Sequence, residues 1–267
     1  MRSNALGRLL TVAAVAALAL VAARPSDAAE DHTGAHARGT RTAAHARVTA
    51  EPVRIMPLGD SITGSPGCWR SLLWNRLQDT GYTGIDMVGT LGPQGCSLPY
   101  DGDNEGHGGA LATVTADQGQ LPGWLAATHP DIVVMHFGTN DVWSAVDPGR
   151  ILDAYSTLVA QMRADNPAMK IVVAQILPMA PSGCAECGAR VEALNALIPE
   201  WARQTSTAGS PVVVVDQWTG FDTAADTYDG VHPNASGDAK MADRWYPALT
   251  GFLTPAADGR PAARTTG

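Results

Sequence analysis

Residues 53–63 read VRIMPLGDSIT, a continuous apolar run that turns directly into glycine and polar residues. Four further runs share this apolar, β-branched character without alternation, at residues 85–88, 132–137, 171–176 and 212–215. Strands that lack a period of two are typical of a parallel sheet covered on both faces. We therefore expect a mostly parallel, five-stranded sheet.

Helix-length segments separate most of these runs. Apolar residues recur at spacings of three and four in residues 69–77, 151–162 and 191–201, and another segment, residues 239–249, follows the last loop. Alternating strands and helices predict a three-layer α/β/α sandwich. In such folds ligands bind at the carboxyl ends of the strands, so we expect the functional site there.

Composition and charge exclude several classes of protein. The 267-residue chain is 45% hydrophobic and 16% charged, which is typical of a globular protein rather than a disordered or polytopic membrane protein. The 18 Lys and Arg residues face 26 Asp and Glu, a formal charge of -8. Without the basic surface that phosphates require, we expect no nucleic-acid partner.

The N-terminal residues predict export. Arg2 and Arg8 precede an apolar run, residues 9–23, which small residues follow. This pattern predicts a secretory signal peptide, residues 1–28. A retained membrane anchor is the weaker alternative, because the run is shorter than the roughly 20 residues that a spanning helix needs. We expect a secreted, extracellular protein without membrane association after cleavage.

Segments without helical or strand periodicity flank one long block of sequence. Residues 29–52 show no helical or strand period and predict a disordered linker, and residues 254–267 predict a flexible tail. Residues 53–253 have the length of a single domain, which we expect to be monomeric. Three linker histidines lack Cys or carboxylate partners at ligand spacing and therefore predict no metal site: His32, His36 and His45.

Four cysteines form an even set in a chain that is expected to be exported, which predicts two disulfides. Of three possible connectivities, sequence proximity favours Cys184 with Cys187 and Cys68 with Cys96. A zinc site lacks a second ligand pair. A redox role for Cys184 and Cys187 is less favoured, because this motif lies in a Pro/Gly-rich loop rather than at a helix start after a strand.

Polar side chains follow two of the predicted strands. Ser61 stands where the first strand turns toward a helix, a place suited to a nucleophile or, alternatively, to a helix cap. No Gly-x-Ser-x-Gly surrounds Ser61, so this is not the nucleophile elbow of the α/β-hydrolases. Asn140 follows residues 132–137 and could present its amide to an oxyanion or merely cap a turn. His136, within that strand, is expected in the core.

The segment DGVHPN places Asp229 and His232 three residues apart in a loop bounded by glycine and proline. A short loop can fold the carboxylate onto the imidazole. The carboxylate then fixes the tautomer and stabilises the imidazolium that forms when His232 takes a proton from a serine. Together with Ser61 and Asn140 at strand ends, this pair predicts catalysis more strongly than any of these residues does alone.

The segments GDSIT, EGHGG, GTND and DGVHPN, in this order, resemble the four signature blocks of the SGNH/GDSL hydrolases. The resemblance covers the whole folded block and implies a flavodoxin-like fold. It implies Ser61 as nucleophile, His232 as base and Asp229 as its orienting partner. It also implies an oxyanion hole of the Ser61 N–H, the Gly109 N–H and the Asn140 amide, without any cofactor or metal.

Within the EGHGG block the donor is assigned to Gly109, with Gly108 as the alternative, because the family pattern reads Gly-His-x-Gly. His107 then belongs to the framework of the motif. Structural, hydrogen-bonding roles are expected for the acidic members of two blocks, Asp60 and Asp141. Residues 101–106 open like a calcium loop, but Ala112 stands where such a loop needs a bidentate Glu.

The segments RIMPLGDSITGSPGCWRSLLW, NEGHGG and HFGTNDV are similar to those of secreted family 3 carbohydrate esterases, the acetyl xylan esterases. The family often has a small polar residue where Gly108 stands, so the acyl pocket departs from the pattern. The resemblance implies deacetylation of xylan or a related polysaccharide through an acyl-serine. Trp143 and Tyr100 could line a sugar-binding surface or simply pack.

Two alternatives remain open. A secreted GDSL lipase or phospholipase would need an extended apolar acyl groove, and the sequence has no long apolar loop insertion to form one. A non-catalytic carbohydrate-binding protein is disfavoured, because competent residues occupy all the catalytic positions.

Overall fold

The computed structural model describes residues 51–256. The predicted signal peptide (residues 1–28), nearly all of the predicted linker (residues 29–52) and most of the predicted tail (residues 254–267) lie outside this range. These predictions therefore stay predictions.

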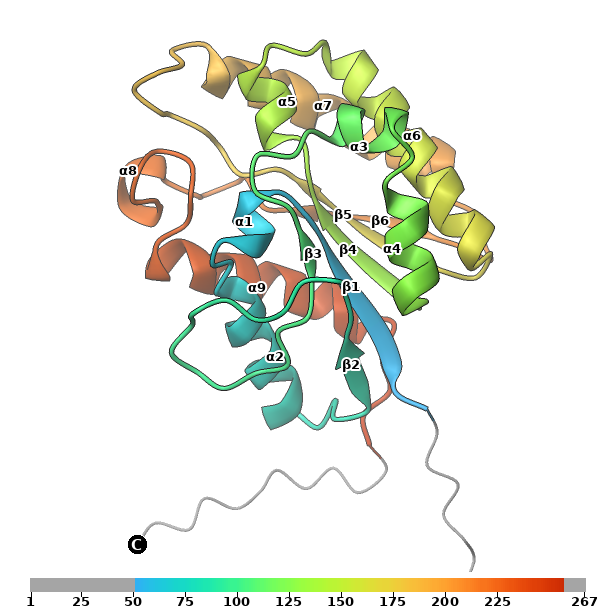
Figure 1. Cartoon of the computed structure of the whole chain (residues 1–267). Coiled ribbons are helices and arrows are strands. Elements are labelled where there is room, and N and C mark those ends of the chain that lie inside the picture. Colours follow the sequence, from blue (N-terminus) through green and yellow to red (C-terminus); the bar gives the residue numbers. More distant parts are fainter. Residues whose placement is uncertain (1–50, 257–267) are drawn as a thin grey trace, which may run out of the picture. The chain divides into compact units, whose positions relative to one another are not determined.

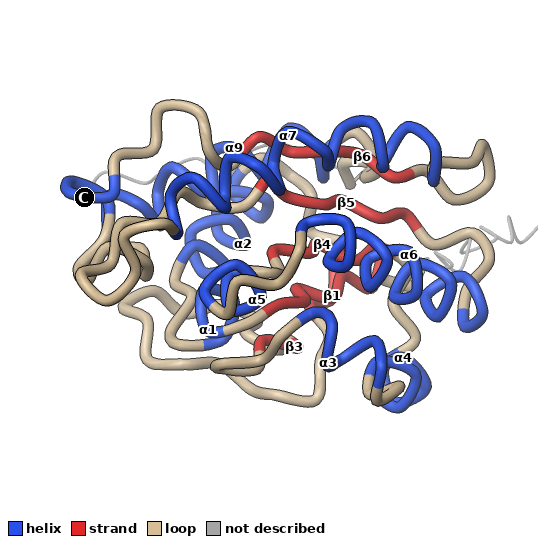
Figure 2. The backbone as a smooth tube through the Cα atoms, turned by 90° about the horizontal axis from the view of Figure 1, so that it is seen from above, coloured by secondary structure: helices blue, strands red, loops and turns tan. Residues whose placement is uncertain are grey.

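One parallel sheet forms the centre of the described domain. Its strands are β1 (Val53–Gly59), β2 (Ile85–Met87), β3 (Glu105–Gly106), β4 (Ile132–His136), β5 (Lys170–Gln175) and β6 (Val212–Asp216). The order is β2-β1-β4-β5-β6, and β3 pairs with the end of β1. Figure 2 shows β3, β1, β4, β5 and β6 side by side. The five predicted strands are present, but the predicted count is one short, because β3 has only two residues.

Helices cover both faces of the sheet (Figure 1). On one face α2 (Trp69–Asp79) packs against α9 (Ala235–Thr250), where the Trp69 and Trp245 ring centroids lie 5.9 Å apart. On the other face α6 (Pro148–Asp165) packs against α7 (Cys187–Thr205). All four predicted helices lie within these elements, which confirms the three-layer α/β/α sandwich.

Short helices at the strand ends escape the periodicity analysis, since few of them complete two turns. They are α1 (Ser61–Gly64), α3 (Ala112–Asp117), α4 (Leu121–Thr128), α5 (Thr139–Trp143) and α8 (Thr223–Asp226). None of the helices within residues 51–256 has the length and apolar character of a membrane span.

The central strands β4 and β5 are buried on both faces, as their unbroken apolar runs predict, whereas the outer strands β2 and β6 are partly exposed. Every residue of β4 is almost fully buried, including the polar His136. Removing a large apolar side chain from water contributes about 1.5–3 kcal/mol. The central strands therefore form a rigid base for the residues that follow them.

Both predicted disulfides are present in the described domain. Cys68 pairs with Cys96 and Cys184 with Cys187. Contrary to expectation, the second motif does lie at a helix start, because Cys187 is the first residue of α7. Cys187 is nevertheless fully buried.

The strand order explains where a site can form. Without β3, the strand order is that of flavodoxin-like folds. In these folds the second strand lies on one side of the first strand and the third strand on the other. The topological switch point lies between the first and third strands. Here that point lies between the carboxyl ends of β1 and β4.

Candidate active site

Three strand ends meet at the switch point. Gly59 of β1 is in register with Gly106 of β3 on one side and with His136 of β4 on the other. A Cβ on Gly59 would lie 2.1 Å from the His136 carbonyl oxygen, so only glycine permits this approach. The three loops that follow these strands therefore start side by side.

Ser61 is the first residue of α1, directly after β1. Asp60 caps the helix, because its Oδ1 accepts a hydrogen bond from the Ile62 N–H at 3.0 Å. The alternative that Ser61 is the cap is therefore wrong. Its Oγ lies 2.9 Å from His232 Nε2, and its N–H belongs to the first turn, where an α-helix has no internal acceptor.

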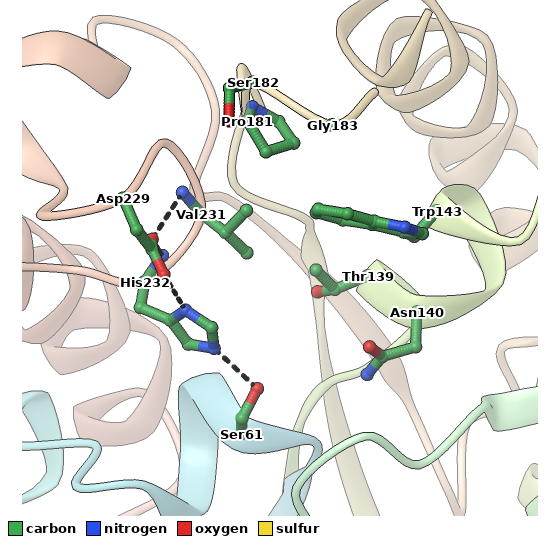
Figure 3. A pocket seen from close by; sticks show the side chains of 10 residues that line it. All are labelled: Ser61, Thr139, Asn140, Trp143, Pro181, Ser182, Gly183, Asp229, Val231 and His232. Carbon is green, nitrogen blue, oxygen red and sulfur yellow. Dashed lines mark hydrogen bonds and ion pairs between the residues drawn. The ribbon is translucent and has the colours of Figure 1, made fainter. Parts of the chain in front are cut away.

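His232 lies between Ser61 and Asp229 (Figure 3). Its Nδ1 is 2.6 Å from Asp229 Oδ2, while Asp229 Oδ1 accepts the backbone N–H groups of Val231 and His232. Burial opposes ionisation of Asp229, but these hydrogen bonds outweigh it and lower the pKa of the carboxyl. The ionised carboxylate thus fixes the Nδ1–H tautomer, and Nε2 can accept the Ser61 proton.

The loop that carries this pair is closed by its own backbone. Thr227 and Pro233 form an isolated bridge, and the Gly230 carbonyl accepts the Ala180 N–H at 2.8 Å. Gly230 has φ +85°, and a Cβ there would lie 2.5 Å from the Ala180 oxygen. The loop is therefore held against the segment that follows β5.

Asn140 lies on α5, across the cavity from His232 (Figure 3). One of its two amide hydrogens is donated to the Ala110 carbonyl at 3.0 Å, which fixes the side chain. In the described domain the N–H groups of Gly108 and Gly109 donate to no backbone acceptor. A Cβ on Gly108 would lie 4.0 Å from the Ser61 Cβ, so the EGHGG block passes directly against the serine.

The motif residues with expected structural roles do hold the framework. Asp141 accepts the Ala112 N–H at 2.7 Å and both the N–H and the hydroxyl of Thr113, so it caps α3. His107 Nε2 lies 2.5 Å from Glu105 Oε1, and its ring stacks on Trp124. These contacts join the glycine block to its neighbours.

Two ionisable groups are buried beneath the site. Burial raises the pKa of Asp60 to about 6, although the Ile62 N–H opposes this shift. Burial lowers the pKa of His136 to about 4. His136 accepts the Leu177 N–H through Nε2 at 3.1 Å and is fully buried, which confirms the prediction of a core histidine.

A cavity of about 540 Å³ opens above Ser61. It is lined by Ser61, Thr139, Asn140, Trp143, Pro181, Ser182, Gly183, Asp229, Val231 and His232. Trp143 lines it with 44% of its surface exposed, whereas Tyr100 packs elsewhere, under the Arg70 guanidinium. No sequence motif predicts the wall formed by residues 181–183, although its place after the carboxyl end of a predicted strand could have indicated it.

Comparisons with known proteins agree with this geometry. Residues 58–240 match the model of the GDSL-like lipase/acylhydrolase family. A "Multidomain esterase" from Ruminococcus flavefaciens is 32% identical over 233 residues, which are 79% of this chain but only 30% of that protein. The chain therefore spans less than a third of the length of this curated relative.

Solved structures give a closer match in length. A carbohydrate esterase of family 3 from Talaromyces cellulolyticus is 38% identical, with 75% of this chain and 97% of that chain covered and a TM-score of 0.69. An acetyl esterase mutant with an acetate ion is 37% identical, with the same coverage and TM-score. These names agree with the prediction of a carboxylic ester hydrolase, and the predicted resemblance to family 3 is confirmed. By its sequence and its structure, the chain belongs to the GDSL-like lipase/acylhydrolase family.

Proposed function

We propose that this protein is a secreted serine esterase that removes short acyl groups, acetyl above all, from xylan or a related polysaccharide. The observation that carries the proposal is the unbroken hydrogen-bond chain from Ser61 through His232 to Asp229 at the wall of an open cavity. A nucleophile, a base and an orienting carboxylate in this arrangement are what acyl transfer requires.

In the proposed mechanism, Ser61 Oγ attacks the ester carbonyl while His232 Nε2 takes the hydroxyl proton. Asp229 stabilises the imidazolium through Nδ1. The tetrahedral intermediate then collapses, and His232 donates the proton to the departing alcohol, which leaves an acyl-serine. Water attacks this ester in the same way, with His232 again as base, and releases the carboxylic acid and free Ser61.

The developing oxyanion is held by the N–H groups of Ser61 and Gly109 and by the second amide hydrogen of Asn140. Gly108 is the alternative to Gly109. All these donors come from loops that follow neighbouring strand ends, which supports an oxyanion hole that is formed before the substrate binds. Such preorganised donors contribute most where charge develops in the transition state.

The size of the cavity, about 540 Å³, favours a small acyl group. Its lining mixes polar side chains with apolar ones, and the exposed Trp143 offers an aromatic face of the kind that packs against sugar rings. A lipase or phospholipase would need an extended apolar groove, which this lining does not provide. The name of the family 3 carbohydrate esterase supports a carbohydrate ester, and the name of the acetyl esterase supports an acetyl group.

Export and a single monomeric catalytic domain, residues 53–253, are part of the proposal. Two disulfides within the described domain support an oxidising compartment. Cys184 and Cys187 are joined and buried, which argues against a disulfide oxidoreductase. Light scattering of the purified protein measures its oligomeric state.

The test is acetate release from acetylated xylan by the wild type and by Ser61→Ala, beside p-nitrophenyl esters from acetate to octanoate. We expect release that is lost in Ser61→Ala, with acetate as the preferred ester. Ser61-dependent cleavage of the longer esters alone would support the lipase instead. Inactivity on every ester would support a binding protein.

A further inference from the structure

One large exposed aromatic side chain lies against His232 and has no place in the mechanism above. The ring of Tyr228 is nearly parallel to the imidazole, with an angle of 11° between the planes and 5.6 Å between the centroids. Tyr228 is not among the ten residues that line the cavity. It therefore lies beside the imidazole without lining the cavity, while 63% of its own surface stays exposed.

The backbone holds this stack in place. The Tyr228 N–H donates to the His232 carbonyl at 3.1 Å, inside the loop that the bridge between Thr227 and Pro233 closes. Burial and the neighbouring carboxylates of Asp229 and Asp238 raise the pKa of the Tyr228 phenol, so the ring stays neutral at every pH where an esterase works. The imidazole therefore faces a neutral aromatic surface throughout.

Resting on the proposed function, we propose that Tyr228 is a positioning residue that stabilises the protonated form of His232 during acyl transfer. The face of an aromatic ring carries partial negative charge and attracts a cation within about 6 Å of its centroid. During catalysis the imidazole becomes such a cation when it takes the Ser61 proton. The stack therefore favours the transition state over the resting enzyme.

Charged groups also act on His232, and their effects must be distinguished from the effect of the Tyr228 ring. Asp229 is hydrogen-bonded to Nδ1, Asp60 interacts with the imidazole electrostatically from beneath Ser61, and Asp238 approaches Tyr228 from α9. All three carboxyls remain in a variant at position 228. A comparison of variants at that position alone therefore isolates the contribution of the aromatic face.

The experiment compares Tyr228→Phe, which keeps the ring, with Tyr228→Leu, which keeps the apolar bulk. The pH dependence of kcat/KM on p-nitrophenyl acetate is measured for both. The energy of an exposed cation–π contact corresponds to about a two- to fivefold change in rate and to a shift of about half a unit in the pH profile. We expect Tyr228→Leu to lose about two- to fivefold in kcat/KM and its acid limb to move down by about half a unit, with Tyr228→Phe unchanged.

The control is Trp218→Leu, another exposed aromatic residue at the carboxyl edge of the sheet, which should leave rate and pH profile unchanged. A purely structural role for Tyr228 would lower the rate without moving the acid limb, and that result would overturn the proposal. Equal behaviour of Tyr228→Phe and Tyr228→Leu would do the same.

A second readout does not depend on activity. NMR titration of the His232 ring in the wild type and in Tyr228→Leu measures the effect of the stack directly. A lower midpoint in the variant supports it, and coincident curves overturn it. If the wild type hydrolyses no ester, the proposed function fails, and this titration still decides whether the stack stabilises the imidazolium.

Discussion

The two halves of the proposed catalytic machinery are built in different ways. Ser61 and Asn140 follow directly from buried, register-fixed strand ends, and the acidic residues beside them, Asp60 and Asp141, are fully buried. The Asp229 and His232 side chains lie on a loop and are 41% and 27% exposed. The sheet half, Ser61 and Asn140, therefore depends on the same contacts as the fold, whereas the loop half, Asp229 and His232, depends on hydrogen bonds within its loop and on the contact of Gly230 with the segment that follows β5.

Removing the base should have the largest effect of all and should leave the fold intact. We expect His232→Ala to lower kcat by about 10⁴- to 10⁶-fold, as loss of a member does in other serine triads. Because the His232 side chain itself is not part of the buried core, the melting temperature should stay close to the wild-type value. Ester hydrolysis and thermal unfolding measure the two properties.

The control for this variant is His129→Asn, which changes an exposed histidine at the end of α4 to a residue that tolerates its left-handed backbone. It should keep full activity. A folded His232→Ala protein with near-wild-type kcat would remove His232 from the mechanism, and an unfolded one would contradict the independence of the loop half.

A minimal change in the sheet half should instead break the fold. In Gly59→Ala the new methyl group would lie 2.1 Å from the His136 oxygen, so β1 and β4 must separate. We expect a loss of more than about 4 kcal/mol in the free energy of unfolding, or no folded protein. Gly84→Ala, where a Cβ meets nothing within 4 Å, is the matched control and should change stability little. Equal denaturation curves for the two variants would refute the steric argument.

Asn140→Ala tests the oxyanion role in the sheet half. Loss of one such donor lowers kcat by about 10²- to 10³-fold, or roughly 3 to 4 kcal/mol. Loss of the hydrogen bond to Ala110 should cost only about 0.5–1.5 kcal/mol of stability. Steady-state kinetics beside urea denaturation separate the two effects, and a near-wild-type kcat would exclude Asn140 from the oxyanion hole.

Asp60→Asn tests the electrostatics of the sheet half. Burial raises the pKa of Asp60 to about 6 in the folded protein. The stability that goes with the neutral carboxyl is fully present below about pH 4 and is lost as the pH rises through 6. Above that pH the buried charge costs about 3 kcal/mol. The stability of Asp60→Asn relative to the wild type should therefore increase by about this amount between pH 4 and pH 7.

The measurement is the free energy of unfolding of both proteins across this pH range. Asp238, whose pKa is also raised to about 6 by burial, titrates in both proteins and cancels in the comparison. Parallel curves for the two proteins would contradict a buried, titrating Asp60.

The sequence predicts the sheet half better than the surroundings of the loop half. Long unbroken apolar runs identify β1, β4, β5 and β6, since burial on both faces leaves no other pattern. Strand β3 has two residues, Glu105 and Gly106, and its pairing depends on β1 rather than on its own side chains. Local sequence therefore does not predict the position of β3.

The motifs locate Ser61, Asn140, Asp229 and His232, because each carries its chemistry in its residue type. They do not locate the wall at residues 181–183, which depends on how distant loops meet, or the stack of Tyr228 on His232, which depends on how their own loop is closed. For the same reason Tyr100 is placed away from the cavity, against Arg70 and Cys96. Local sequence patterns do not predict such tertiary contacts.

The most direct test of the central claim is the intact mass of the protein after reaction with diethyl p-nitrophenyl phosphate, followed by peptide mapping. We predict one diethylphosphoryl group for each wild-type molecule, attached to Ser61. Ser61→Ala should remain unmodified, and His232→Ala should react far more slowly. Modification at another residue, or equal labelling of Ser61→Ala, would contradict the account.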